Sequence, residues 1–585
     1  MSSAINFSNL NTSGNTSSFA GITSGINTTA LVQAEVAQAS LPLQQLQAQQ
    51  TANNNESSAL TNLQTQMQAL ASALSDLNTI GLTARTVTSS DSTNSYVTAT
   101  ASGGASGTYS LQVQQVATNA QLSPSLDSSG NPTNLAVASA TAPVFTDTSG
   151  NGTGTATFAI EGTDGVTKQI TLSGGQNNIY ALAAAINAAT VPDPTVPGSV
   201  GLGVNATVVN TGSGPDPYEL VLTSAQTGVG SAGSNLTIAD VTAGGAVNTL
   251  GIAAGTLSSD GSSIASGGTQ SNQAAQDAQF SLDGIKLTRA SNNVSDAVQG
   301  VTFNLVQGNQ TGTTTLTVAP DASTASTSMQ SMISAYNSLM NAYNTDIAGS
   351  GPLSGNTGAM ALIQQIQATL TGPVHGLAAS SIYNSASSLG VSTNSNGTLS
   401  LDTTKFTAAF QADPTAATNV FATSSSSTNA VVSLGVAGPN TASGVFGFNI
   451  TSYTAGGAVA GTITAPDGTQ YNLTGTNGVL MGTQGTPLDG LYLDVSGTGT
   501  GSLNLAQGAG QAAQNVITNL TDPVTGTITQ LLNQITTSNQ DLASQITVQQ
   551  NYLNTLQTNL QNQYSQMEST LAQLQAASQS ITTLG

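Results

Sequence analysis

Two stretches near opposite ends of the chain carry apolar side chains at helical spacing. In residues 546–584 the steps between apolar positions are mostly three and four, and no proline or glycine interrupts the run. This spacing keeps one face of a helix apolar over many turns. Between Leu60 and Leu77 the steps are 3, 4, 3, 4 and 3, which is the a/d pattern of a coiled coil.

We expect both stripes to be assembly interfaces. A helix over residues 546–584 would be about 58 Å long, which is more than a compact domain offers to cover it. Each buried Leu contributes about 1.5–3 kcal/mol, so an uncovered stripe would drive association. The pattern also allows the two ends to pair with each other, as a helical hairpin within a monomer, but we favour contacts with other copies. The predicted interface residues are Leu60, Leu63, Met67, Leu70, Leu74, Leu77, Leu553, Leu556, Leu560, Met567, Leu571, Leu574 and Ile581.

Shorter patterns predict the elements between the stripes. A helix capped by Thr28 or Thr29 runs to about Ile80, with a second start or kink at Ser40 and Pro42. Helical spacing returns after Pro320 and again near Gln511. Alternating segments predict strands at 97–101, 107–113, 155–160, 169–172, 204–209, 219–222, 236–238, 301–305 and 313–318, a helix at 179–187, and hairpin turns at 283–284 and 467–468.

The predicted fold class is therefore α+β: long N- and C-terminal coiled-coil helices, a helical domain, and several β-rich head domains inserted between them. We expect six segments. They are a disordered N-terminus plus leg helices (1–85), a β head domain (86–120 with 276–320), an outer β-rich head domain (121–275), a helical leg domain (321–423), an additional β module (424–510), and a C-terminal leg and coiled-coil helix (511–585).

Charge is scarce and one-sided. Of 585 residues, 26 are acidic and 5 are basic, giving a net charge of -21, and no basic residue follows Lys405. Nucleic-acid binding and attraction to anionic membranes both need clustered Lys and Arg, so these two partner classes are excluded. The chain has no cysteine, no pattern typical of a cleaved signal peptide and no apolar run of membrane-spanning length.

Candidate chemistry is also scarce. His375 is the single histidine, in a turn-like stretch with no nucleophile motif nearby. Residues 147–152 begin like a calcium loop, but position 12 of that loop is Phe158, where a Glu would be needed. We therefore expect a structural protein with no catalytic, cofactor-binding or metal site.

Several segments, spread over both ends and the middle of the chain, together match the pattern of one family. They are Gly21-Ile-Thr-Ser-Gly-Ile-Asn-Thr-Thr-Ala-Leu-Val32, Leu41-Pro-Leu-Gln-Gln-Leu46, Ala84-Arg-Thr-Val-Thr-Ser-Ser-Asp91, the stretches 97–101, 107–113 and 283–302, Leu389-Gly-Val-Ser-Thr393, 397–402, 410–414, and Tyr564, Met567, Glu568, Leu571 and Leu574. In these segments the chain resembles flagellar hook-associated protein 2, the filament cap of bacterial flagella. Two features depart from the family pattern. They are the β module at 424–510, and the Gln and Asn that replace charged residues in the terminal helices.

The resemblance implies an extracellular ring of about five or six copies at the filament tip. It implies flagellin, the hook–filament junction protein and a cytoplasmic export chaperone as partners, and export without a cleaved signal peptide. It implies that the ring retains exported flagellin and promotes its folding and insertion. The alternatives are another flagellar axial protein, either flagellin or the junction protein, and a surface-layer or adhesin protein.

Overall fold

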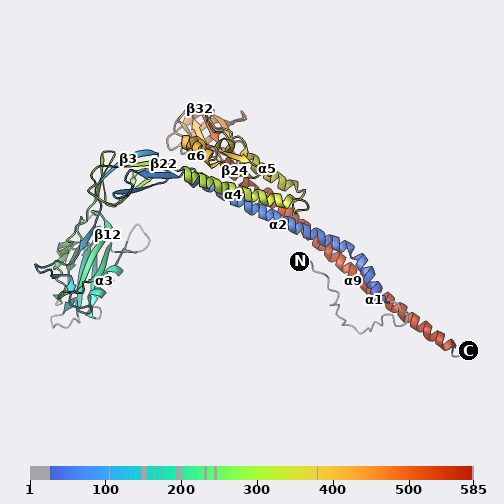
Figure 1. The fold of residues 1–585 in the computed structure, drawn as a ribbon, viewed down its shortest axis with the longest axis horizontal. Coiled ribbons are helices and arrows are strands. Elements are labelled where there is room, and N and C mark those ends of the chain that lie inside the picture. The colour runs from blue at the N-terminus through green and yellow to red at the C-terminus, as the bar shows by residue number, and fades with distance from the viewer. Residues whose placement is uncertain are drawn as a thin grey trace. The chain divides into compact units, whose positions relative to one another are not determined.

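The chain folds into two compact units, one formed by residues 1–82 with 322–585 and the other by residues 83–321. The computed structural model describes residues 27–103, 106–146, 154–163, 165–174, 177–192, 199–201, 203–229, 233–242, 247–378 and 380–582 (Figure 1). The predicted disordered segment before residue 27 and the loop at 147–152 lie outside these residues. The mixture of long helices and many antiparallel sheets confirms the α+β class.

The first unit is built on long helices, of which α2 and α9 run side by side (Figure 1). A short hairpin of β23 (Val391–Thr393) and β24 (Leu399–Leu401) packs on α4. The helical elements are α1 (Thr28–Ala39), α2 (Leu41–Asp76), the π-helical turn η2 (Leu77–Gly81), α4 (Ala322–Ile347), α5 (Thr357–Thr371), the 3-10 turn η4 (Ala386–Leu389), α6 (Thr403–Ala412), α7 (Pro414–Asn419), α8 (Ala509–Leu520) and α9 (Thr527–Thr582).

The N-terminal helical segment is broken where proline predicted. Ser40 separates α1 from α2, and Pro42 lies in the first turn of α2, where its missing N–H group has no helical partner to lose. The predicted cap was one or two residues too late. Asn27 is the N-cap, because its side chain accepts a hydrogen bond of 3.0 Å from the N–H of Ala30.

The far end of α2 closes with a π turn that packs tightly on α4. The sequence predicted a helix that runs to about Ile80, and the turn ends one residue later, at Gly81. A Cβ atom at Gly81 would lie 2.5 Å from the Cβ of Ser328 in α4, so only glycine permits this approach.

A break between α8 and α9 was missed. The sequence predicted one helix from about Gln511 to the C-terminal stripe, but residues 521–526 are not helical. Pro523 lies in this interval and cannot continue the backbone hydrogen-bond ladder. Asp522 fixes the connection instead, since its carboxylate accepts hydrogen bonds from the N–H groups of Val524 and Thr525.

Residues 424–506, between α7 and α8, form one eight-stranded antiparallel sheet. The first and last strands of the order β25-β32-β27-β28-β29-β30-β31-β26 contact each other, so the sheet curls into a barrel. Its interior is a separate apolar core that includes Phe446, Phe448, Ile463 and Leu493. The strands are β25 (Ser424–Ser427), β26 (Val432–Val436), β27 (Gly444–Tyr453), β28 (Ala458–Thr464), β29 (Gln470–Thr476), β30 (Val479–Met481), β31 (Tyr492–Val495) and β32 (Gly499–Ala506).

The second unit contains two apolar cores. One core includes Phe280 and Phe303 and is enclosed by a five-stranded sheet, β1-β22-β3-β18-β19, and a three-stranded sheet, β2-β21-β20. The strands predicted at 97–101 and 107–113 are confirmed, the second extending to Gln115, but they belong to different sheets. The strands are β1 (Arg85–Ser89), β2 (Val97–Ala101), β3 (Gly107–Gln115), β18 (Ala278–Leu282), β19 (Ile285–Arg289), β20 (Asn293–Val298), β21 (Val301–Leu305) and β22 (Thr314–Pro320).

The other core of this unit includes Phe145 and Phe158 and lies among short strands and one helix. The main sheets are β11-β12-β4, with β5 beside β12, and β17-β13-β7-β8. The elements are β4 (Asn119–Leu122), β5 (Ala136–Val137), β6 (Phe145–Thr146), β7 (Thr155–Glu161), β8 (Thr167–Ser173), α3 (Ile179–Ala188), β9 (Thr190–Pro192), β10 (Ser199–Gly201), β11 (Val204–Asn210), β12 (Tyr218–Thr227), β13 (Thr237–Asp240), β14 (Val247–Asn248), β15 (Gly255–Leu257), β16 (Ile264–Gly267) and β17 (Thr269–Gln270).

Both hairpin turns predicted from Asp-Gly pairs are confirmed. Residues 283–284 join β18 to β19, and both have positive φ, at 48° for Asp283 and 81° for Gly284. These angles suit the twist of a two-residue hairpin. Residues 467–468 lie in the turn that joins β28 to β29, and Gly468 has a φ of 84°.

Replacing Leu70 by Ala is expected to lower the free energy of unfolding of the helical unit by about 2–5 kcal/mol, because it leaves a cavity at a fully buried position. Leu41→Ala is the matched control: this leucine lies on the same helix but is exposed, and its loss should change stability by less than about 0.5 kcal/mol. Denaturant unfolding followed by far-UV circular dichroism measures both. Equal effects of the two variants would contradict the assigned core.

Candidate assembly interface

The six residues of the first predicted stripe are fully buried inside this chain. Leu60, Leu63, Met67, Leu70, Leu74 and Leu77 each have 0% relative exposure and belong to one apolar core. A side chain without exposed surface cannot contact a neighbouring molecule in this fold. In this fold the chain itself therefore covers the six positions, where the sequence led us to expect other copies.

Three helices from distant parts of the sequence cover this stripe. α2 packs against α4, α8 and α9. α4 brings its own apolar face, with Met329, Met332, Tyr336 and Leu339 buried in the same core. Periodicity showed that the face of α2 must be covered, but it could not show whether the covering helices belong to the same chain.

The second predicted stripe is covered for only part of its length. Ile546 and Leu553 of α9 form a small core with Val32, Val36 and Leu43 of α1 and α2. Leu560 and Tyr564 are half-buried against it. α1 therefore pairs with the middle of α9, as in the hairpin alternative.

Beyond this core the apolar face of α9 becomes progressively more exposed to solvent. Met567 and Leu571 are half-buried, and Leu574 is 61% exposed. Leu556, nearer the middle of the helix, is half-buried, and the side chain of Ile581 lies outside the described part of the chain. The surface best placed for contacts with another molecule is therefore the C-terminal part of α9.

Two exposed apolar residues of α9 were not predicted. Val548 and Tyr552 lie off the seam that faces α1, and both are exposed. They are four residues apart, so they lie on one face of the helix. This i, i+4 pair was visible in the sequence but did not fit the heptad that the prediction followed.

Uncharged hydrogen bonds join the helices where the apolar seam is interrupted. The side chain of Asn53 donates to the hydroxyl of Ser538 at 3.0 Å, and Asn539 donates to the side-chain oxygen of Asn54 at 2.9 Å. Gln549 donates to the carbonyl of Ala39 at 3.4 Å. Asn539 occupies the heptad position between Ile535 and Leu542. Gln549 occupies the one between Ile546 and Leu553. Polar residues at such core positions fix the register of paired helices.

Charged side chains take little part in the helical core. The ion pair between Arg289 and Asp296, at 3.0 Å, belongs to the other unit. Burial raises the pKa of Tyr336 to about 12, and its hydroxyl donates to the carbonyl of Gly397 at 3.1 Å. The helical core is thus held by apolar packing and by neutral hydrogen bonds.

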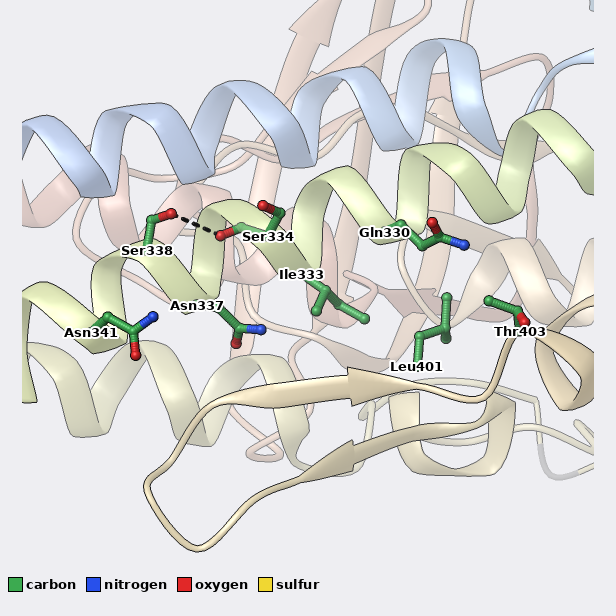
Figure 2. A pocket seen from close by; sticks show the side chains of 8 residues that line it. All are labelled: Gln330, Ile333, Ser334, Asn337, Ser338, Asn341, Leu401 and Thr403. Carbon is green, nitrogen blue, oxygen red and sulfur yellow. Dashed lines mark hydrogen bonds between the residues drawn. The ribbon is translucent and has the colours of Figure 1, made fainter.

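A groove along α4 faces the β23–β24 hairpin (Figure 2). Asn337 fixes the hairpin on the helix, since its amide donates to the carbonyl of Leu399 at 2.8 Å and accepts from the N–H of Leu399 at 2.7 Å. Gln330, Ser334, Ser338 and Asn341 follow the same helix, and Ser338 donates to the carbonyl of Ser334. The lining contains no carboxylate, histidine or cysteine, so it offers no general base or metal ligand.

Two further kinds of site are absent from the described ranges. No group of three or more His, Cys, Asp or Glu residues there is placed to hold a metal ion. Among the described helices, none combines the length and the apolarity needed to span a bilayer.

Asn539→Leu is expected to raise the unfolding midpoint of the helical unit. Asn539 carries a buried side-chain oxygen with no hydrogen-bond partner, and its partner Asn54 is exposed and can bond to water. Replacing a poorly satisfied amide by a leucine at a seam position should stabilise the pair of helices by roughly 1 kcal/mol. Thermal unfolding measures the change, and a lower midpoint would contradict this view of the seam.

Asp522 predicts a pH dependence. Hydrogen bonds from the N–H groups of Thr525 and Val524 and from the hydroxyl of Thr525 hold the pKa of this carboxyl below its usual value of 3.8. A lowered folded-state pKa gives stability that is present above pH 3.8 and is lost as the pH falls through the folded-state value. Asp522→Ala should therefore lower the unfolding midpoint at neutral pH, and by less near pH ~2.

The control for this experiment is Asp541→Ala, which removes the same charge from an exposed position of α9. It should leave the midpoint unchanged at both pH values. A pH-independent effect of Asp522→Ala would show that its carboxylate does not order the α8–α9 connection.

Comparison with known proteins gives matches over most of these elements. The C-terminal family model of flagellar hook-associated protein 2 matches residues 275–576, and the N-terminal model matches residues 24–120. The protein of that name from Campylobacter jejuni is 30% identical over 303 residues, which cover 46% of this chain and only 44% of that protein. The B-type protein of Pseudomonas aeruginosa is 27% identical over 372 residues, covering 61% of this chain and 70% of that protein.

A solved structure is also similar. It is the crystal structure of the D1-D2-D3 domains of the flagellar cap protein FliD from Escherichia coli. The sequence identity is 26%, the alignment covers 63% of this chain and 89% of the Escherichia coli chain, and the TM-score is 0.44. The C-terminal family model alone spans more than half of the 585 residues. The chain therefore belongs to the flagellar hook-associated protein 2 family.

Proposed function

We propose that this chain is the filament cap of a bacterial flagellum. It acts as a structural protein: an oligomeric ring at the filament tip that retains exported flagellin and promotes its folding and insertion. The observation that carries the proposal is the match of both family models, which together span residues 24–120 and 275–576. The printed name of the Escherichia coli structure, flagellar cap protein, supports the same role.

The surface of the helical unit supports an assembly role. The C-terminal part of α9 carries an apolar face that ends in the exposed Leu574, and Val548 and Tyr552 are exposed earlier on the same helix. Apolar surface of this kind is stabilised when another protein covers it. In the proposed ring, α9 contacts neighbouring copies or the filament, while the core of α2 stays within each copy.

The proposed partners are those that the family implies. They are other copies in a ring of about five or six, flagellin, the hook–filament junction protein, and a cytoplasmic export chaperone. The proposed location is outside the cell at the filament tip, reached by flagellar export without a cleaved signal peptide. Because the exposed part of α9 is almost free of charged side chains, its contacts should depend little on salt or pH.

A polymerisation assay separates a cap from another axial protein. Adding the purified chain to flagellin at a small fraction of the flagellin concentration should increase the rate and extent of filament growth. Long filaments of the chain alone would instead identify it as a filament-forming axial protein. Negative-stain images of the purified chain should show closed rings whose subunits can be counted, whereas an extended two-dimensional lattice would contradict a cap.

Leu571→Asp combined with Leu574→Asp is expected to abolish filament capping and motility, because two charges enter the apolar face of α9. The matched control is Ser569→Asp with Gln573→Asp, which adds the same charge to exposed polar positions of the same turns. Both variants should keep the circular dichroism spectrum of the parent protein. Normal motility of the leucine variant would refute the role of this face.

A further inference from the structure

Three exposed apolar side chains form a row across the outside of the barrel. β31 lies between β26 and β30, and its Tyr492 pairs with Val436 on one side and with Met481 on the other. The exposed fractions are 56% for Val436, 40% for Tyr492 and 55% for Met481. Directly paired residues on adjacent strands contact each other, so the three side chains make one continuous surface.

The row is not part of the barrel core. The alternate residues of the same strands, Leu480 and Leu493, point inward and are fully or almost fully buried. The core is therefore complete without the outer row. No described element covers this face, and apolar groups that neither fill a core nor meet a partner are unusual when they cluster.

A carboxylate borders the row. Asp494 follows Tyr492 by two residues, so it lies on the same face of β31, and it pairs with Val479 of β30. A Cβ atom built on Gly435 of β26 would lie 3.0 Å from one Asp494 oxygen, so the carboxylate lies over bare backbone. Asp494 is exposed and makes no hydrogen bond or ion pair with the described part of the chain.

We propose that this face of the barrel binds a partner polypeptide through a Lys or Arg side chain set among apolar residues. The aliphatic stem of such a side chain fits against Val436 and Met481, and its charge is attracted both by the face of the Tyr492 ring and by the Asp494 carboxylate. A fully apolar partner would leave the carboxylate desolvated and unpaired.

Charge distinguishes this partner from a second copy of the chain. The barrel contains Asp467, Asp489 and Asp494 and no basic residue. Every one of the five basic residues of the chain precedes the barrel, and the net charge is -21. Two copies that met through this face would bring like charges together, which opposes association. The complementary surface is therefore basic.

The proposed binding of a basic polypeptide by the barrel is separate from filament capping. The face belongs to residues 432–494, whereas the proposed capping contacts lie on α9. Variants of the face should leave flagellin polymerisation unchanged, so failure of one proposal does not decide the other.

The first test measures binding of a fluorescent peptide, Leu-Arg-Leu-Arg-Leu, to the full-length protein by anisotropy, with Leu-Gln-Leu-Gln-Leu as the neutral comparison. Asp494→Asn should weaken binding of the Arg peptide by roughly tenfold or more, because it removes the charge from a charge-assisted contact. Asp467→Asn, at the hairpin turn on the same barrel, changes the net charge equally and should have no comparable effect.

A second pair of variants tests the apolar row. Tyr492→Ser should weaken binding of the Arg peptide, whereas Val445→Ser, which alters an exposed valine on β27 of the same barrel, should not. Equal weakening by Asp494→Asn and Asp467→Asn would overturn the proposal, because it would show that the peptide is attracted only by the overall negative charge. The absence of an effect of Tyr492→Ser would overturn it as well.

Methyl NMR of protein labelled at its eight methionines locates the contact. Adding the Arg peptide should shift the signal of Met481 and leave that of Met360, which is exposed on α5, unchanged. If the Met481 signal shifts instead with protein concentration and without peptide, the face binds a second copy, and the proposed basic partner is wrong.

Discussion

The fold of the helical unit depends on one interaction: the burial of the α2 stripe under α4, α8 and α9 of the same chain. Residues that lie more than 240 positions apart meet there, since α2 ends at Asp76 and α4 begins at Ala322. Long-range contacts of this kind join the two ends of the sequence into one body. Because this core uses the most regular apolar face of the chain, the assembly that we propose relies on apolar surface outside it, chiefly on the C-terminal part of α9.

Neutral polar side chains, and not ion pairs, form the polar contacts between the long helices. Asn and Ser side chains join α2 to α9, and Gln549 joins α9 to α1. Carboxylates such as Asp522 accept hydrogen bonds from nearby backbone instead of pairing with cations. This arrangement avoids the desolvation of ions when helices or subunits pack. A charge that lies unpaired beside an exposed apolar face, such as Asp494 on the barrel, therefore indicates the charge of the partner that would bind there.

Local sequence patterns predicted the elements well, because local physics determines them. Alternation identified strands such as 301–305, Asp-Gly pairs identified the turns at 283–284 and 467–468, and Pro42 marked the start of α2. Pairing could not be predicted in the same way: strands 97–101 and 107–115 are close in sequence but lie in different sheets. For the same reason the sequence showed that Leu60–Leu77 must be covered, but not that the same chain covers them. The row of Val436, Tyr492 and Met481 required the strand register, which no single segment contains.

The most direct test of this account is amide hydrogen exchange of the full-length protein at concentrations below and above the onset of assembly. Amides of residues 60–77 should be equally protected at both concentrations, because the helices that cover α2 belong to the same molecule. Residues 567–580 of α9 should gain protection only when copies assemble or flagellin is present. Protection of residues 60–77 that appears only on assembly would contradict the account, since it would place the cover over α2 in a neighbouring molecule.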